Sequence, residues 1–197
     1  DIDKILKNKE ISDLKKIIGL KTGEDYSGKT ESNWPLRYGK LMIMCDQDVD
    51  GSHIKGLLMN LFHTFWPSLL KSDFVTSLIT PIIKATKSKQ VLTFYTLTDY
   101  EEWKKANKNG KGWKIKYYKG LGTSTSKEAK EYFKTMKQVL YTWNEQNSHE
   151  SIDLAFNKKR SDDRKNWLQQ YNREEILNSN DKEVSFNDFI EKEFKHF

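Results

Sequence analysis

The sequence lacks the features that mark several classes of protein. Cys45 is its only cysteine, so no disulfide can form within the chain, and we expect a reducing compartment. No apolar run approaches the roughly 20 residues of a membrane span, and no signal peptide is visible. Internal repeats and low-complexity segments are also absent. These absences argue against a disulfide scaffold, a membrane protein and a repeat array, and they predict a soluble, intracellular protein.

Composition indicates a globular protein with a small positive charge. The mean hydropathy of -0.82 reflects charge density rather than disorder, because 36% hydrophobic and 13% aromatic residues suffice for a core. A length of 197 residues suits one domain, or one domain with an appended piece. The net charge of +6 is by itself typical of a soluble protein. Here an acidic group lies between basic flanks, which suits a polyanion held near a metal.

The most informative stretch covers residues 40–58 and reads KLMIMCDQDVDGSHIKGLL. An apolar run, residues 41–44, is followed by Asp46, Asp48 and Asp50, then by Gly51 and a helical pattern. This order predicts a buried strand that leads into a helix, as in α/β units. Ligands in such sheets bind at the carboxyl ends of the strands, so we expect an active site at the aspartates.

Three carboxylates within five residues repel one another unless a cation or basic groups neutralise them. An all-oxygen ligand set favours magnesium, manganese or calcium over zinc. The alternative is a solvated acidic turn whose Asp side chains cap backbone amides at the start of the next helix. The histidines show no ligand spacing and are interpreted as ordinary surface or core residues: His53, His63, His149 and His196.

Other acidic motifs share part of this spacing. An EF-hand loop needs a Glu at its twelfth position and a helix in front, but Leu57 occupies that position after a predicted strand. A phosphatase of the haloacid-dehalogenase type would use Asp46 as nucleophile and Asp48 as acid/base, although Asp50 stands where that motif has Thr or Val. A non-catalytic DNA-binding module, driven by the basic clusters, is the third alternative.

Two further stretches are candidate anion contacts. The glycines of KGLGTSTS, residues 119–126, let backbone amides approach an anion, but the same residues suit a turn with Ser126 as N-cap of the next helix. The densest basic cluster is Lys158, Lys159, Arg160, Arg164 and Lys165, for which a solvated helix face is the default interpretation. Lys55, one turn beyond the aspartates, is expected to be their counterion, or less readily a phosphate contact.

Periodicity and turn residues predict the remaining elements. Helical patterns are expected at residues 1–20, 54–66, 98–108, 127–140, 151–156, 161–171 and 185–197. Strands are expected at residues 41–44, 74–84 with a break at Thr80-Pro81, 91–97 after a basic turn, and 114–118. Residues 21–35 are predicted to form a polar loop.

Asp46, Asp48 and Gly51 match the DxDxxG motif of Toprim domains, whose strand-borne acids hold magnesium for phosphoryl transfer on nucleic acids. Longer stretches closely resemble eukaryotic type IIA DNA topoisomerase, in the same order and over nearly the whole chain. They are RYGKLMIMCDQDVDGSHIKGLL at 37–58, ITPIIK at 79–84, KYYKGLGTSTSKEAKEYF at 116–133, AFNKKRSDDRKNWL at 155–168 and FNDFIEKE at 186–193.

The resemblance implies an α/β Toprim fold, which is Rossmann-like, with a mainly parallel sheet flanked by helices. Residues 1–140 would form the Toprim domain, and residues 141–197 a helical linker leading toward a winged-helix domain. The family's first acidic motif, a Glu in an EGDS-like turn, would precede Asp1. We therefore expect this chain to hold an incomplete site.

The resemblance also implies a function. The family makes a transient double-strand break in DNA through a 5′-phosphotyrosine link and passes a second duplex, as a nuclear homodimer that uses ATP in another region. Asp46 would be catalytic and would bind Mg²⁺ with Asp48 and Asp50, Mn²⁺ or Ca²⁺ being substitutes. Contacts to double-stranded DNA would come from Lys119, Gly120, Arg164 and Lys165. The nucleophilic tyrosine would lie past Phe197, so Tyr117 and Tyr118 are not the nucleophile, and the chain alone should be inactive.

Overall fold

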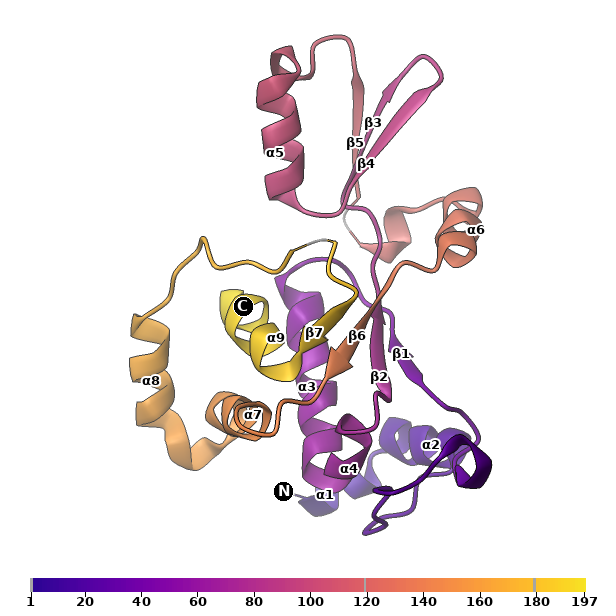
Figure 1. The fold of residues 1–197 in the computed structure, drawn as a ribbon, viewed down its shortest axis with the longest axis vertical. Helices are drawn as coiled ribbons and strands as arrows, with labels where there is room; N and C mark the ends of the chain where they lie inside the picture. Colours follow the sequence, from indigo (N-terminus) through magenta and orange to yellow (C-terminus); the bar gives the residue numbers. More distant parts are fainter. Residues whose placement is uncertain (1, 119, 179) are drawn as a thin grey trace.

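The computed structural model describes residues 2–118, 120–178 and 180–197. Its elements form an α/β body and a smaller lobe that projects from one end of the body (Figure 1). The body carries a four-stranded sheet, and the lobe carries a separate three-stranded sheet. Within the described ranges, no helix is both long and apolar enough to cross a membrane.

The sheet of the body has the order β1-β2-β6-β7. Its strands are β1 (Leu41–Ile43), β2 (Val75–Leu78), β6 (Gln138–Thr142) and β7 (Glu183–Ser185). The β1/β2 and β6/β7 pairs are parallel, whereas β2 and β6 are antiparallel. The expected α/β architecture, a largely parallel sheet flanked by helices, is therefore confirmed for the body.

Helices pack against this sheet and form the hydrophobic core of the body together with it. They are α1 (Ile2–Lys7), α2 (Lys9–Ile18), α3 (Val49–Phe65), α4 (Pro67–Leu70), α7 (Ser148–Phe156), α8 (Ser161–Gln169) and α9 (Phe186–Lys192). Phe62 of α3 and Phe189 of α9 are both fully buried in this core. Each such side chain contributes roughly 1.5–3 kcal/mol by leaving water. The core therefore combines α3 with the last helix of the chain.

The lobe has its own small core. It consists of β3 (Ile83–Lys87), β4 (Gln90–Phe94), β5 (Lys114–Tyr117) and α5 (Leu97–Ala106). Its sheet is antiparallel, in the order β4-β3-β5, and the predicted basic turn joins β3 to β4. Phe94 and Tyr100 are buried together, with Trp103 and Trp113 packed around them. This wholly antiparallel sheet adds to the expected architecture.

Several predicted boundaries were wrong. The helix expected at 127–140 is α6 (Ser126–Thr135), which ends because Met136 adopts the left-handed conformation. The next residues form β6, whose partners β2 and β7 lie far away in the sequence. Thr125, not Ser126, caps α6 through the Glu128 N–H. The first helix is split at Asn8, which caps α2.

Residues 141–197 are not wholly helical either, because β7 pairs with β6 just before α9. Strand β6 crosses residue 140, and the core of the body draws on both sides of it. The division at residue 140 itself stays a prediction. Short 3₁₀ turns complete the chain: Glu31–Asn33, Lys108–Gly110, Leu121–Thr123, Lys158–Arg160 and Phe194–His196.

Gly56 lets the end of the chain pack against α3. A Cβ at this position would lie 2.5 Å from the Phe194 ring and 3.1 Å from Phe156. Overpacking costs about 1–3 kcal/mol, more than the roughly 1 kcal/mol that Ala gains over Gly in a helix. We expect Gly56→Ala to lower the free energy of unfolding in urea, whereas Thr64→Ala on the exposed side of α3 should change it little. An unchanged or higher value for Gly56→Ala would show that this contact is unimportant.

Candidate functional site

The aspartates lie at the carboxyl end of β1, as expected. Strand β1 ends at Ile43, and α3 begins at Val49. Asp48 is the N-cap of α3, and its Oδ1 accepts the Gly51 N–H at 2.8 Å. The capping role considered as an alternative is therefore real for Asp48, but it uses only one of the two carboxylate oxygens.

Gly51 permits the tight turn that carries these acids. A Cβ on Gly51 would lie 1.9 Å from the backbone oxygen of Asp46, so any other residue would force the turn open. The Cys45 thiol donates to the Gly51 carbonyl at 3.3 Å. Burial raises the pKa of the Cys45 thiol, which keeps it protonated and suits a structural role.

The glycine-rich loop lies directly against Asp46. The Leu121 N–H donates to Asp46 Oδ1 at 2.7 Å across a sequence separation of 75 residues. A Cβ on Gly120 would lie 2.2–2.5 Å from the Asp46 carboxylate atoms, and Gly120 has φ +87°. The structure thus brings together two of the predicted site stretches. Lys119 lies outside the described residues.

Glu128 fixes this loop from the other side, and sequence reasoning missed it. Its carboxylate accepts hydrogen bonds from the Tyr118 hydroxyl, from Lys116 Nζ at 3.1 Å and from the Thr125 N–H at 2.8 Å. Burial alone would raise the pKa of Glu128, but the hydrogen bonds outweigh it and lower the pKa to about 2. The signal in the sequence is the capping box Thr125-Ser-Lys-Glu128.

Asp46 and Asp48 are suited to a hard cation. Each uses one oxygen for a backbone N–H, and the second oxygen of each accepts no hydrogen bond from the described residues. Two carboxylates, with further oxygens from water or phosphate, are a usual donor set for Mg²⁺. Among the described residues no three carboxylate, imidazole or thiolate groups lie close enough together to hold a metal. Asp50 is exposed in the first turn of α3, and its metal role stays a prediction.

Lys55 is not the counterion of the aspartates. It is 2% exposed, and its Nζ forms an ion pair with Glu193 at the end of α9. The Ser52 hydroxyl lies 2.8 Å from the same Glu193 oxygen. Both predictions for Lys55 were wrong because the buried ammonium needs a buried partner, and the fold supplies one 138 residues away.

Two of the five residues of the basic cluster near α8, Arg160 and Arg164, make contacts within the fold. Arg164 Nη1 donates to the carbonyls of Leu154 and Asn157, at 2.9 and 3.1 Å, and so covers the end of α7. Arg160 forms ion pairs with three carboxylates: Glu150, Asp153 and Asp163. Lys165 is exposed. Figure 1 places α8 and α6 on opposite flanks of the body, so Arg164 and Lys165 do not join the group around Asp46.

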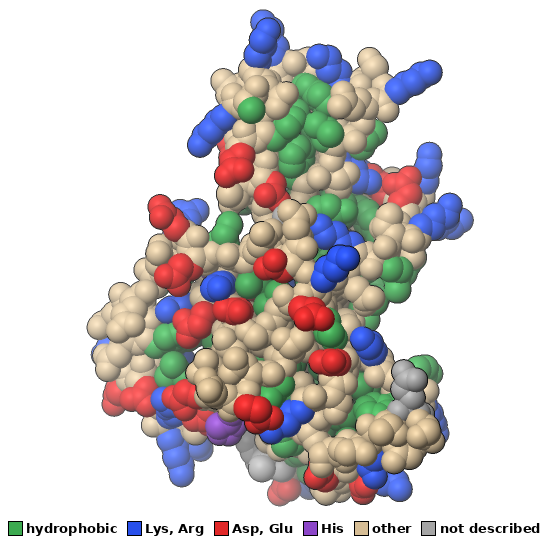
Figure 2. All heavy atoms as spheres, viewed as in Figure 1, with side chains coloured by type: hydrophobic (Ala, Val, Ile, Leu, Met, Phe, Trp, Pro, Cys, Tyr) green, Lys and Arg blue, Asp and Glu red, His purple; other side chains and the backbone are tan. Residues whose placement is uncertain are grey.

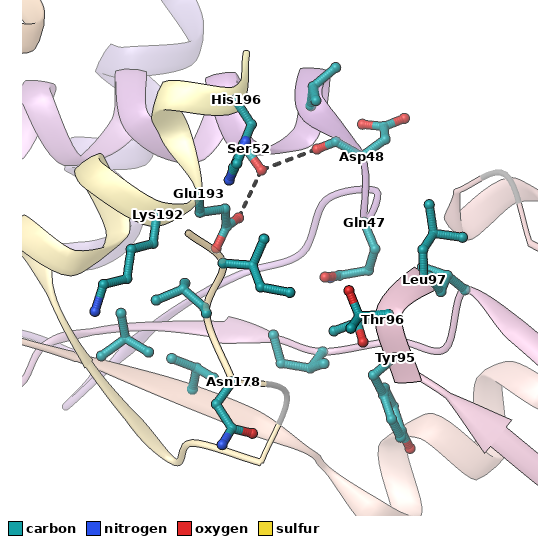
Figure 3. A pocket seen from close by; sticks show the side chains of 18 of the residues that line it. Gln47, Asp48, Ser52, Tyr95, Thr96, Leu97, Asn178, Lys192, Glu193 and His196 are labelled. Atoms are coloured by element: carbon teal, nitrogen blue, oxygen red, sulfur yellow. Dashed lines mark hydrogen bonds between the residues drawn. The ribbon is translucent and has the colours of Figure 1, made fainter. Parts of the chain in front are cut away.

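A cleft of about 1060 Å³ opens beside Asp48, between the body and the lobe. Figure 3 shows Asp48, Ser52 and Glu193 along one side of it, with Gln47 facing Thr96 and Tyr95 from the lobe. Gln47 Nε2 donates to the Leu78 carbonyl at 3.2 Å, which joins the turn after β1 to the end of β2. In Figure 2 Lys and Arg side chains project around the lobe and the α6 side and also from parts of the body, while acidic side chains gather over the body.

Residues 78–197 match the family described as the C-terminal associated domain of TOPRIM. The chain belongs to this family. It is 49% identical, over 96% of its length, to DNA topoisomerase 2-beta of Homo sapiens. It is 50% identical, again over 96% of its length, to DNA topoisomerase 2 of Arabidopsis thaliana. It spans only 12% and 13% of those two relatives.

A solved structure agrees with this assignment. The whole chain superposes, with a TM-score of 0.91 and 45% identity, on 27% of a structure titled Plasmodium falciparum topoisomerase II DNA-binding, cleavage and re-ligation domain. The resemblance to eukaryotic type IIA topoisomerase that the motifs indicated is confirmed. The roles assigned to individual site residues stay predictions.

The contact between Gly120 and Asp46 leads to a matched pair of substitutions. Gly120→Ala introduces a clash with the Asp46 carboxylate at a positive φ, which should cost about 1–3 kcal/mol. Gly122→Ala is the control, because a Cβ there meets nothing within 4 Å. We expect urea unfolding to separate the two variants, with Gly122→Ala within about 0.5 kcal/mol of the parent chain. Equal effects at both positions would contradict the close approach.

The lowered pKa of Glu128 predicts a pH dependence of stability. Its folded pKa of about 2 lies below its ordinary value of 4.5, so the ionised carboxylate stabilises the fold above pH 4.5. This stabilisation is lost as the pH falls from 4.5 toward 2. We expect Glu128→Gln to be less stable than the parent chain at pH 7, with the difference shrinking over that window. Glu131→Gln, whose carboxylate is half-exposed, is the control and should show a smaller change.

Proposed function

We propose that this chain is the Toprim portion of an ATP-dependent type II DNA topoisomerase. The observation that carries the proposal is the end of β1, where Asp46 and Asp48 are oriented by backbone N–H groups and each present one oxygen. The named relatives and the solved neighbour support the same activity for the parent protein. In that protein a transient double-strand break, held by a 5′-phosphotyrosine link, lets a second duplex pass.

Asp46 and Asp48 bind Mg²⁺ in this proposal, and Asp50 supports it directly or through water; Mn²⁺ and Ca²⁺ are substitutes. Bound there, Mg²⁺ would neutralise charge on the scissile phosphate and on the departing 3′ oxygen. The Leu121 N–H holds the Asp46 carboxylate in place, and Gly120 keeps the loop close to it. A further carboxylate from elsewhere in the parent protein would complete the site.

The DNA backbone is the proposed ligand of the surrounding basic groups. Lys119 and Gly120 would contact it beside the acids, whereas Arg164 and Lys165 would contact it from the flank of the body. Such contacts read no sequence and weaken as the salt concentration rises. The proposal also includes a homodimeric parent protein in the nucleus, with ATP used by another region.

The tyrosines beside the site support a nucleophile from elsewhere. Tyr118 is buried, and burial together with its hydrogen bond to Glu128 raises the pKa of its hydroxyl. The Tyr117 hydroxyl lies 3.4 Å from that of Tyr100. Tyr118 is therefore a poor nucleophile, whereas Tyr117 is exposed and its exclusion as the nucleophile rests on the resemblance. The phosphatase alternative loses support because the chain is 49% and 50% identical to the two DNA topoisomerases named above.

The test uses the complete parent protein. Rapid denaturation during incubation with supercoiled plasmid and magnesium should trap protein covalently attached to DNA 5′ ends. We expect Asp46→Asn to reduce this linkage by at least about a hundredfold, because it removes one carboxylate charge from the metal site. Asp181→Asn, on an exposed residue, is the control and should leave it unchanged. Absence of linkage in an active, folded protein would refute the proposal.

A further inference from the structure

Two histidines meet on the body, far apart in the sequence. His63 lies near the end of α3, and His149 lies in the first turn of α7. His63 Nε2 and His149 Nδ1 are 2.8 Å apart and share one hydrogen bond, so that one ring donates its proton to the other, and the ring centroids are 4.9 Å apart. Local sequence patterns did not indicate this pair, because its members are separated by 86 residues.

The pair is remote from the acidic site. Helix α3 starts directly after Asp48, and at about 1.5 Å per residue His63 lies about 22 Å further along its axis. A ligand of the two imidazoles therefore does not share the carboxylates at the end of β1. The inference is also independent of the proposed topoisomerase function.

The spacing of the two nitrogens fits joint coordination of one ion. Zinc binds imidazole nitrogen at about 2.0–2.1 Å, so two nitrogens on one ion are about 2.8–3.4 Å apart for angles between about 90° and 109°. The observed 2.8 Å is close to the lower end of this range. The ion would replace the proton that the two nitrogens share. Each ring would then carry its proton on the other nitrogen.

The surroundings favour a neutral His63 ring. His63 is half-buried, and burial and the neighbouring His149 lower its pKa, which Asp153 partly opposes. A neutral imidazole keeps the lone pair that a metal needs. The Asp153 carboxylate, held by Asn157 and Arg160, acts electrostatically on both rings. Its negative charge attracts a cation toward the pair only in part, because Arg160 already forms an ion pair with it.

We propose that His63 and His149 form a site for a divalent transition-metal ion of the Zn²⁺, Cu²⁺ and Ni²⁺ class, which bridges α3 and α7. Imidazole ligands select this class over Mg²⁺ and Ca²⁺, which prefer oxygen. No third carboxylate, imidazole or thiolate of the described chain completes the set, so water fills the other positions. The bound ion ties two helices of the body together and stabilises the folded chain by mass action.

Cu²⁺ is the probe for the ligand set, because electron paramagnetic resonance reports the nitrogens bound to it. We expect the 197-residue chain to bind one Cu²⁺ with the signature of two imidazole nitrogens. Only a large excess of Zn²⁺ should compete with it, because Cu²⁺ binds such sites more tightly, and excess Mg²⁺ should not compete. His149→Gln and His63→Gln should each weaken binding by more than about tenfold. His53→Gln, on the same helix but stacked on Phe197, is the matched control and should bind normally.

Thermal unfolding gives a second readout that does not depend on copper. Zn²⁺ should raise the unfolding midpoint of the parent chain and of His53→Gln, but not that of His149→Gln. Because His149 is exposed, its substitution should leave the fold intact, which the midpoint without metal checks directly. A two-nitrogen signal that persists in His149→Gln would overturn the proposal, as would the absence of such a signal in the parent chain.

Discussion

The hydrogen bond from the Leu121 N–H to the Asp46 carboxylate is the contact on which the site depends. It joins the turn after β1 to the loop before α6 at 2.7 Å. Gly51 and Gly120 flank Asp46 from two directions, and neither position has room for a Cβ. The Leu121 N–H and the two glycines therefore position the Asp46 carboxylate, and its second oxygen accepts no hydrogen bond from the described residues. A carboxylate that is held by main chain keeps its orientation when neighbouring side chains move.

This contact in turn depends on how the lobe is inserted into the body. The chain leaves the body after β2, builds β3, β4, α5 and β5, and returns through the glycine loop to α6 and β6. Main-chain hydrogen bonds join the segments that connect the body and the lobe. The Ile79 N–H donates to the Lys137 carbonyl at 2.8 Å, and the Tyr118 N–H donates to the Ile82 carbonyl at 2.9 Å. Glu128 then gathers Tyr118, Lys116 and Thr125 at the return point. The loop that contacts Asp46 is thus held by hydrogen bonds on both sides, at Tyr118 and at Thr125.

Local sequence patterns predicted the strand, turn and helix that carry the aspartates, but not the long-range contacts that hold them in place. The run before Asp46 and the period after Gly51 predicted the strand, the helix and the place of the acids, because each signal lies within a few residues. Strands β6 and β7 were missed because their pairing is long-range, and β6 follows a helical pattern without a strong break. The Lys55–Glu193 ion pair and the contact between His63 and His149 could not be predicted from local patterns either. Such contacts are decided by packing, which brings together residues that the sequence separates widely.

The distribution of charge gives the strongest physical reason to expect a cation at the end of β1. Lys55 forms an ion pair with Glu193, and Arg160 forms ion pairs with three carboxylates on the other flank. No lysine or arginine of the described residues forms an ion pair with Asp46 or Asp48. Two neighbouring carboxylates without a basic partner repel each other, and the repulsion disfavours the turn that holds them. The described fold tolerates this because backbone N–H groups share the charge, and the divalent ion proposed for this site would relieve the rest. The same local imbalance that weakens the free turn would thus strengthen its hold on a metal.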